Sequence, residues 1–304
     1  MSRLLVTTPD PSLSAELAAR TAADVRVWDL TGPPPADRID MVVPPYMGSP
    51  RPLGHLAGLD VRLVQSQSIG YDYVVDFLPA GHVYANAAGV HEASTAELAV
   101  ALILAAQREL PALVRDADAE RWNRPFTPSL ADRRVTIIGV GGVGRAIAAR
   151  LAPFEVELRR VGRTRREDDD GLVYGTSDLP AVLPDSEIVV VAVPLTPETT
   201  RMVDRAFLAL LPAGALLVNV ARGAVADTDA LVEFSAAGRI RLALDVVDPE
   251  PLPTGHPLYH QATVLTPHIG GYTTAMRPRL LRLFAEQLDR LGSGREPLNV
   301  VLRT

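Results

Sequence analysis

Apolar strand-like runs alternate with amphipathic helical segments between residues 134 and 268, and this alternation restricts the fold more than any other feature of the sequence. Continuous apolar strands separated by such helices are typical of a parallel sheet covered by helices on both faces. The strand candidates are 134–139, 157–161, 187–193, 214–220, 240–247 and 263–266, and the helix candidates are 143–154, 201–211 and 227–237. We therefore predict a doubly wound α/β domain in this part of the chain.

The first ninety residues show a weaker form of the same alternation. Strand candidates are 3–7, 25–28, 41–43 and 62–65, a long helix is expected at about 93–116, and a final helix at about 273–291. Because domains usually have roughly 100–200 residues, the 304 residues of this chain predict two domains.

Two absent residue types limit the chemistry that the chain can perform. It has no cysteine, which excludes cysteine nucleophiles, disulfides and thiolate metal sites, and all 30 basic residues are arginine. The lack of lysine excludes a P-loop lysine, a Schiff base and a lysine general base. Histidine, carboxylates, arginine, hydroxyls and backbone amides remain, and no metal site is expected.

Charge and hydropathy argue against a nucleic-acid or membrane partner. The net charge is −6, and the longest apolar run, 98–106, is far shorter than the ~20 residues of a membrane-spanning helix. The apolar stretch at the N-terminus is too short for a secretory signal. We therefore expect a cytoplasmic protein.

The segment Gly139-Val140-Gly141-Gly142-Val143-Gly144 follows a candidate strand and opens a candidate helix. In that context G-x-G-x-x-G is typical of dinucleotide binding, because glycines let the backbone approach the pyrophosphate and the helix N-terminus offers unpaired N–H groups. Methyltransferases have related loops, and glycine-rich turns also occur for packing reasons. The flanking strand and helix favour the dinucleotide interpretation.

The next strand candidate ends in Val161-Gly162-Arg163-Thr164-Arg165-Arg166. A chain that binds the ribose 2′-hydroxyl of NAD usually has an acidic residue there. Glycine stands in that place here, and the arginines can bind a 2′-phosphate. NADP(H) is therefore favoured, although NAD(H) remains open. The alternative is an exposed basic loop balanced by the acidic run 167–170, which we expect to be a solvated loop.

Five segments occur in a fixed order between residues 139 and 268. They are the glycine loop, Val193-Pro194-Leu195-Thr196, Asn219-Val220-Ala221-Arg222-Gly223, Asp245 to Pro251 (Asp-Val-Val-Asp-Pro-Glu-Pro) and Thr266-Pro267-His268. In this order the sequence resembles the D-isomer-specific 2-hydroxyacid dehydrogenases over nearly its whole length, most strongly from 86 to 272. The resemblance implies that Arg222, Glu250 and His268 are the catalytic trio.

The side-chain chemistry of this trio suits the reduction of a 2-keto acid. Histidine titrates near neutral pH and can deliver a proton to the carbonyl oxygen. A neighbouring carboxylate, Glu250, would favour the protonated ring and orient it. Arg222 can bind the substrate carboxylate and polarise the carbonyl group.

The resemblance also implies larger sets of binding residues. The substrate-binding set is Ser68, Ile69, Gly70, Arg222 and His268, in which a tight glycine turn would hold a carboxylate through backbone N–H groups. Thr95 would pack by the nicotinamide and Asp245 would bind its carboxamide. The cofactor-binding set is Thr95, Gly139, Gly141, Gly142, Val143, Gly144, Arg163, Thr164, Arg165, Pro194, Thr196, Val220, Ala221, Asp245, His268 and Gly270.

Some features depart from the family pattern or stay undecided. The interval from Arg222 to Glu250 is one residue shorter than usual, apparently within 239–244. The first domain is short, and its turn Pro44-Pro45-Tyr46-Met47 and the nearby His91 can border the substrate or serve packing alone. His256 and His260 are expected to be loop residues.

The resemblance implies a two-domain architecture with a catalytic function. A flavodoxin-like substrate domain would comprise 1–93 and 272–304, and a Rossmann cofactor domain 94–271. Family members are generally homodimers, and the apolar run 98–106 is either a dimer contact or a core helix. We expect a glyoxylate/hydroxypyruvate reductase type of enzyme. The alternatives are an NAD-dependent phosphoglycerate or other D-2-hydroxyacid dehydrogenase and a non-catalytic dinucleotide-sensing protein.

Overall fold

The computed structural model describes residues 3–304, which divide into two compact units. The first unit extends to His91 and also includes Thr274–Thr304, while the second unit is Glu92–Thr273. The boundaries predicted from the sequence, 93/94 and 271/272, lie within a few residues of these. Among the described helices, each is too short or too polar to cross a bilayer.

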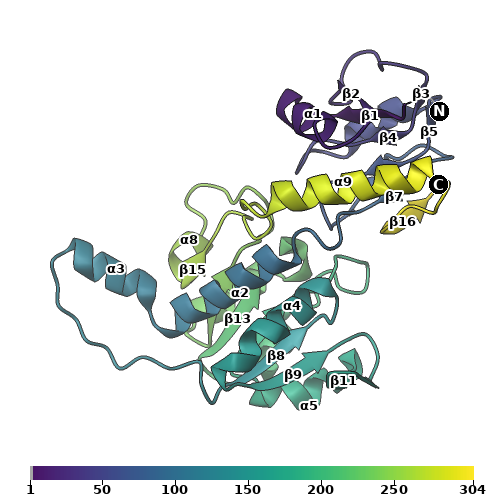
Figure 1. Ribbon diagram of the computed structural model, residues 1–304. Coiled ribbons are helices and arrows are strands. Elements are labelled where there is room, and N and C mark those ends of the chain that lie inside the picture. The colour runs from purple at the N-terminus through teal and green to yellow at the C-terminus, as the bar shows by residue number, and fades with distance from the viewer. Residues whose placement is uncertain (1–2) are drawn as a thin grey trace. The chain divides into compact units, whose positions relative to one another are not determined.

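The first unit contains a six-stranded sheet in the order β16-β7-β6-β4-β1-β2. Strands β1, β2, β4, β7 and β16 of this sheet are labelled in Figure 1. All neighbouring pairs are parallel except β16 with β7. The parallel strands have the flavodoxin-like order 2-1-3-4-5. Strands β7 and β16 were not predicted from the sequence. The strands are β1 (Leu5–Thr8), β2 (Asp24–Val27), β4 (Met41–Val42), β6 (Val64–Gln65), β7 (Val83–Ala85) and β16 (Val300–Arg303), with β3 (Arg38–Ile39) and β5 (Asp60–Val61) forming a separate pair.

Helices α1 (Pro11–Ala18) and α9 (Met276–Gly292) bury their apolar sides against this sheet. Leu13 and Leu17 of α1 and Phe284 of α9 join Val6 of β1 in one core cluster. The C-terminal helix is therefore part of the first unit, although the second unit precedes it in the sequence. Two short 3-10 helices complete the unit, η1 (Arg51–Leu56) and η2 (Val74–Asp76).

The second unit contains an eight-stranded sheet in the order β10-β11-β9-β8-β12-β13-β14-β15. From β11 onward this is the Rossmann order 3-2-1-4-5-6 with a further parallel strand, as predicted. The strands are β8 (Arg134–Ile138), β9 (Glu157–Val161), β10 (Arg166–Asp168), β11 (Gly171–Tyr174), β12 (Ile188–Val191), β13 (Ala215–Asn219), β14 (Ile240–Leu244) and β15 (Val264–Leu265).

Helices cover this sheet and divide its core into two clusters. One cluster joins α2 and α4 to the sheet, and the other joins α6 and α7 to it. The α-helices are α2 (Glu92–Gln107), α3 (Leu110–Asp118), α4 (Gly142–Leu151), α5 (Leu179–Val182), α6 (Arg205–Leu210), α7 (Thr228–Ala236) and α8 (Leu258–Gln261), and the 3-10 helices are η3 (Ala152–Phe154), η4 (Thr176–Asp178), η5 (Leu183–Asp185) and η6 (Gly223–Val225).

The prediction of one helix over 93–116 is wrong, because the chain breaks between α2 and α3. Glu109 has a left-handed backbone (φ 54°), and Pro111 follows at the second position of α3. Proline has no N–H to continue the ladder of the preceding helix, so a new helix starts there. The helix predicted from residue 201 also starts late: Arg201 has φ 53°, and the side chain of Asp204 caps α6.

The acidic run 167–170 is not a simple solvated loop. Glu167 and Asp168 belong to β10, which pairs antiparallel with β11 to form a hairpin at the edge of the sheet. The carboxylate of Asp168 receives two hydrogen bonds, 2.7 and 3.1 Å long, from the buried Arg160 of β9. The ion pair ties the hairpin to the adjacent strand.

Candidate active site

Three neighbouring parallel strands, β13, β14 and β15, bring their following segments to one edge of the second unit's sheet. Arg222 follows β13, Asp245 directly follows β14, and His268 follows β15. Ligands of doubly wound sheets bind at the carboxyl ends of the strands. The one-residue shortening before β14 does not disturb this edge, since β14 pairs in continuous register with β13.

His268 and Glu250 form the central contact of the site. The Nδ1 atom of His268 lies 2.8 Å from Oε2 of Glu250, and both side chains remain partly exposed. His268 has a left-handed backbone (φ 53°), and its amide donates to the carbonyl oxygen of Asp245 at 2.8 Å. With Nδ1 engaged by the carboxylate, the second ring nitrogen, Nε2, is the one that can exchange a proton with a ligand.

Glu250 stays ionised more readily than an ordinary glutamate. Burial of its carboxyl group raises the pKa, but the hydrogen bond and charge of His268, the amide of Val247 and the charge of Arg222 together lower it below its usual value. The Val247 amide donates to Oε1 at 3.1 Å, so each carboxylate oxygen has a partner. The site therefore holds a fixed negative charge next to the imidazole.

Asp245 fixes the turn that carries His268. Its buried carboxylate accepts hydrogen bonds from the Thr266 hydroxyl (2.7 Å) and from the amides of Ile269 and Gly270 (both 2.9 Å). A methyl group on Gly270 would lie 2.9 Å from Oδ2 of Asp245 and 3.4 Å from the Thr95 side chain. Asp245, Thr95 and Gly270, which the resemblance assigned to the cofactor site, thus lie side by side.

Asn219 holds the backbone around Arg222, and the sequence analysis gave it no role of its own. It is almost fully buried, its amide group donates to the carbonyl of Arg222 at 3.0 Å, and its oxygen accepts from the amide of Ala221 at 3.0 Å. The guanidinium of Arg222 also donates to the carbonyl of Ala221 at 2.7 Å. The signal in the sequence was a polar amide at the end of a wholly apolar strand.

The glycine loop is built for close backbone approach. A Cβ on Gly139 would lie 2.5 Å from the carbonyl oxygen of Ala192, and one on Gly144 would lie 1.8 Å from that of Gly139. A Cβ on Gly141 would meet nothing within 4 Å. Gly144 therefore packs the first turn of α4 against the end of β8, and Gly139 packs against the backbone that follows β12. Gly141 borders open space at the N-terminus of α4, which leaves room for a pyrophosphate.

The arginines after β9 differ in what they contact. Arg165 pairs with Asp178 at 3.2 Å, and its guanidinium lies 5.3 Å from the centre of the Tyr174 ring. Arg166 donates to the carbonyl of Thr164. Hydrogen bonds from Thr196 and from the backbone lower the pKa of Glu198 most, and the charge of Arg163 lowers it further. Arg163 therefore lies toward the segment that contains Pro194 and Thr196.

The predicted substrate loop, Ser68-Ile69-Gly70, belongs to the first unit. Two hydrogen bonds hold this loop. The amide of Ser68 donates to the Ser66 hydroxyl, and the side-chain amide of Asn86 donates to the carbonyl oxygen of Ile69. His91 is buried in the same unit, where its Nε2 lies 2.7 Å from the carbonyl oxygen of Gln67 and its ring stacks on Tyr46.

In the part of the chain that the structure describes, the two remaining histidines of the second unit form no hydrogen bond or ion pair with His268 or Glu250. His256 accepts from the amide of Leu258, and His260 is on α8. Among residues 3–304, no group of histidine and acidic side chains is arranged to hold a metal ion.

The chain is similar to known proteins over most of its length. Residues 100–270 match the family model for the D-isomer specific 2-hydroxyacid dehydrogenase, NAD binding domain. Human glyoxylate reductase/hydroxypyruvate reductase is 31% identical over 308 residues, covering 95% of this chain and 94% of the relative. Glyoxylate reductase of Thermofilum pendens is 32% identical over 253 residues, covering 79% and 75%.

A solved structure shares the fold over nearly the whole chain. It is a D-isomer specific 2-hydroxyacid dehydrogenase from Xanthobacter autotrophicus Py2 in complex with NADPH and MES. The TM-score is 0.84 and the identity 28%, with 99% of this chain and 98% of the other covered.

Proposed function

Because the chain belongs to the D-isomer specific 2-hydroxyacid dehydrogenases, we propose that it is an NADPH-preferring reductase of small 2-keto acids, of the glyoxylate/hydroxypyruvate type. It is an oxidoreductase of the nicotinamide-dependent class. The observation that carries the proposal is the 2.8 Å contact between His268 and Glu250 beside Arg222, at the strand ends that follow the glycine loop.

The reaction consumes one 2-keto acid, one NADPH and one proton, and yields the 2-hydroxy acid and NADP⁺. When bound, the nicotinamide supplies the hydride that adds to C2. His268 donates the proton to the carbonyl oxygen from Nε2, while Glu250 balances the charge of the protonated ring. Arg222 binds the substrate carboxylate and polarises the carbonyl group. The Ser68–Gly70 backbone of the first unit would bind a substrate carboxylate through its N–H groups.

The other assigned residues position the cofactor. Gly139, Gly141, Gly142, Val143 and Gly144 would hold the pyrophosphate, for which the open space beside Gly141 is suited. Thr95, Asp245 and Gly270, which lie together, would contact the nicotinamide end. Pro194, Thr196, Val220 and Ala221 would line the rest of the cofactor at neighbouring strand ends.

We expect Arg163 to bind the ribose 2′-phosphate of NADP(H). No acidic residue ends β9, and within residues 3–304 no ion pair of the Arg163 side chain is found, whereas Arg165 is paired with Asp178. Arg165, which follows Thr164, is a second cation of this turn, although Asp178 balances its charge. Both arginines would favour a phosphate over a free ribose hydroxyl.

The first test is loss of reduced-nicotinamide absorbance with the purified protein. NADPH and NADH are compared with glyoxylate, hydroxypyruvate, pyruvate and bulkier 2-keto acids. We expect turnover with the small acids and a lower KM for NADPH than for NADH. Cofactor binding without turnover of any 2-keto acid would contradict the enzymatic assignment and favour a dinucleotide-sensing protein.

The cofactor preference has its own test. Arg163→Ala should raise the KM for NADPH about tenfold or more and leave that for NADH nearly unchanged, since one charge-assisted contact to phosphate is worth about 1.5–3 kcal/mol. Arg20→Ala, an exposed arginine of the first unit, is the matched control. Equal effects on the two cofactors would refute the role of Arg163.

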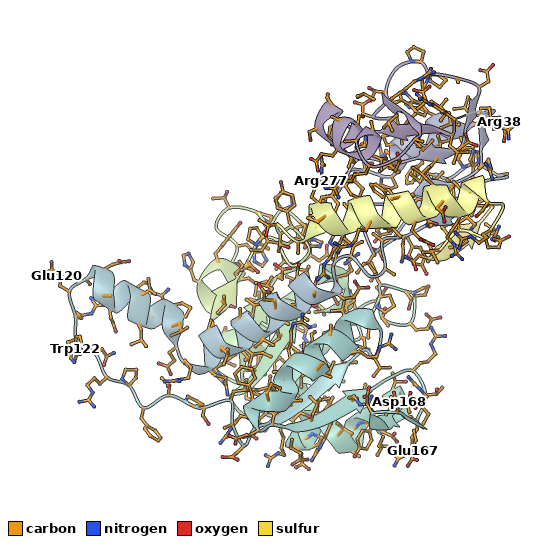
Figure 2. The ribbon with its side chains drawn as sticks, viewed as in Figure 1. Arg38, Glu120, Trp122, Glu167, Asp168 and Arg277 are labelled. Atoms are coloured by element: carbon orange, nitrogen blue, oxygen red, sulfur yellow. The ribbon has the colours of Figure 1, made fainter. Side chains whose placement is uncertain are left out.

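We also infer that two copies of the chain pair through the second unit. The run 98–106 is mainly a core element, since Ala99, Leu102, Ile103 and Ala106 are buried within their own unit. The adjoining arm, formed by α3 and residues 119–129, instead stands away from the sheet of that unit (Figure 2). No residue of α3 is buried, and Leu110, Val114, Trp122 and Phe126 are exposed. Exposed apolar surface of this extent is typical of a protein interface.

A further inference from the structure

The turn that carries Glu250 has contacts on two sides. On one side it packs against Gly223, where a Cβ would lie 1.8 Å from the carbonyl oxygen of Val247 and 2.7 Å from the amide nitrogen of Asp248. Within the turn, the Val247 amide donates to Oε1 of Glu250. The position of the turn therefore decides where Oε2 meets His268.

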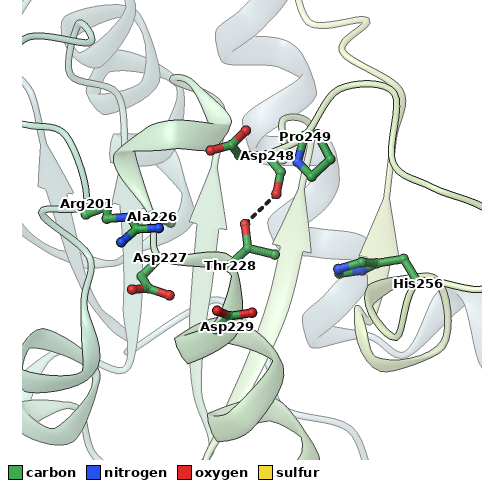
Figure 3. A pocket seen from close by; sticks show the side chains of 8 residues that line it. All are labelled: Arg201, Ala226, Asp227, Thr228, Asp229, Asp248, Pro249 and His256. Atoms are coloured by element: carbon green, nitrogen blue, oxygen red, sulfur yellow. Dashed lines mark hydrogen bonds between the residues drawn. The ribbon is translucent and has the colours of Figure 1, made fainter.

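On the other side the turn is held by a hydroxyl from α7. Oγ1 of Thr228 donates to the carbonyl oxygen of Asp248 at 2.7 Å, as Figure 3 shows. Thr228 is the first residue of α7, and the cap of this helix is supplied separately by Asp227, which accepts from the amide of Ala230. The Thr228 hydroxyl is thus not needed to start the helix.

Behind this contact lies a polar pocket of about 250 Å³. Thr228 and Asp248 line it together with Arg201, Ala226, Asp227, Asp229, Pro249 and His256 (Figure 3). Val247 and Leu252, on either side of Asp248–Pro251, pack in the apolar core of the unit, whereas Asp248 itself borders this pocket. The hydrogen bond from Thr228 is therefore a specific restraint between α7 and the turn.

We propose that Thr228 is a positioning residue, which holds the Asp248–Glu250 turn so that the Glu250 carboxylate meets the imidazole of His268. Thr228 touches neither Glu250 nor His268 and acts through the backbone of Asp248. The role of Thr228 rests on the proposed function of Glu250 and His268. It predicts a loss that depends on the hydroxyl group and not on the shape of the side chain.

The test compares Thr228→Val, which keeps the shape and removes the hydroxyl, with Thr228→Ser, which keeps the hydroxyl. We expect Thr228→Val to lower kcat about three- to tenfold, as for loss of one hydrogen bond, with the KM values for cofactor and keto acid within about twofold of wild type. Thr228→Ser should restore most of the rate. The control is Thr21→Val, which removes a hydroxyl-to-carbonyl bond in the first unit.

The pH profile provides a readout that a purely structural role would not change. His268 and Arg222 face Glu250, and burial of the carboxyl group opposes their lowering of its pKa. When the turn loosens, the pKa of Glu250 should rise, so the acid limb of the kcat profile should move to higher pH in Thr228→Val. An unchanged profile together with wild-type kcat would overturn the proposal, as would equal losses in the Val and Ser variants.

A second measurement does not depend on turnover. A ring N–H that donates to a carboxylate gives a downfield proton signal in NMR, which the His268→Gln variant assigns. The signal should broaden or disappear in Thr228→Val and persist in Thr228→Ser. Wild-type protein that shows the signal but reduces no keto acid would refute the proposed function alone. A signal unchanged in Thr228→Val would refute the role of Thr228.

Discussion

At the scale of single residues, the sequence identifies the reacting side chains better than the groups that hold them. Arg222, Glu250 and His268 were assigned from ordered motifs. In the structure Glu250 and His268 contact each other, and the charge of Arg222 lies close enough to lower the pKa of Glu250. Asn219 and Thr228 could not be assigned in the same way, because their importance lies in which backbone carbonyl they reach. A carbonyl partner leaves no mark in the sequence.

Glu250→Gln tests the charge of the carboxylate. The pKa of Glu250 lies below its usual value, so in wild type the negative charge persists as pH falls and is lost only when pH passes that lowered pKa. The variant has no charge at any pH. We expect kcat for reduction at pH 7.5 to fall about 10- to 100-fold, and the difference from wild type to narrow as pH falls through the pKa of Glu250, where wild type loses the same charge. The measurement is kcat against pH, and parallel profiles for both proteins would contradict the prediction.

At the scale of elements, the parallel strands of the second unit were predictable and the irregular connections were not. A continuous apolar strand such as β12 can only be buried. The β10–β11 hairpin depends instead on an ion pair between the buried Arg160 and Asp168, which a turn separates in the sequence. Likewise the break before α3 depends on Glu109 adopting a left-handed backbone next to Pro111. The proline was visible in the sequence, but the apolar periodicity on either side of it concealed the break.

The start of α4 allows packing to be separated from binding. Gly144→Ala should lower the free energy of unfolding by about 1–3 kcal/mol, since its Cβ would overlap the carbonyl oxygen of Gly139. Gly141→Ala should leave stability nearly unchanged, because its φ is −74° and nothing lies within 4 Å, but it should weaken NADPH binding. Thermal unfolding and cofactor titration measure the two effects. A Gly141→Ala protein with wild-type affinity would exclude this loop as the pyrophosphate site.

Glu187 ties the first residues of β8 to the start of β12. Burial of Glu187 raises its pKa, but the amide of Arg134 and the charges of Arg133 and Arg134 lower the pKa below its usual value. A carboxylate with a lowered pKa stabilises the fold above its unfolded-state pKa and loses this effect as pH falls through the folded-state pKa. Glu187→Gln should therefore cost about 1 kcal/mol at pH 7 and progressively less as pH falls through the folded-state pKa of Glu187. A difference between the two unfolding curves that stays constant with pH would argue against the ion pair.

At the scale of the whole molecule, the arm after α2 should govern assembly. Val114→Glu places a charge on the exposed apolar side of α3, where Val114 is 60% exposed and no side chain of its own unit would be disturbed. We expect the variant to sediment as a monomer at concentrations where wild type is a dimer, with unchanged thermal stability of each subunit. Val27→Glu, at an exposed valine of β2, should leave the mass unchanged. A monomeric wild-type protein would refute the pairing.

The edges of the second unit's sheet have a consequence for the behaviour of the protein at high concentration. One edge is β10, whose three exposed residues Arg166, Glu167 and Asp168 are all charged, and the other is the two-residue strand β15. Long uncharged edge strands offer free N–H and C=O groups on which strands of other molecules can add. Neither edge here offers such a template, so the sheet resists growth by the addition of strands from other molecules.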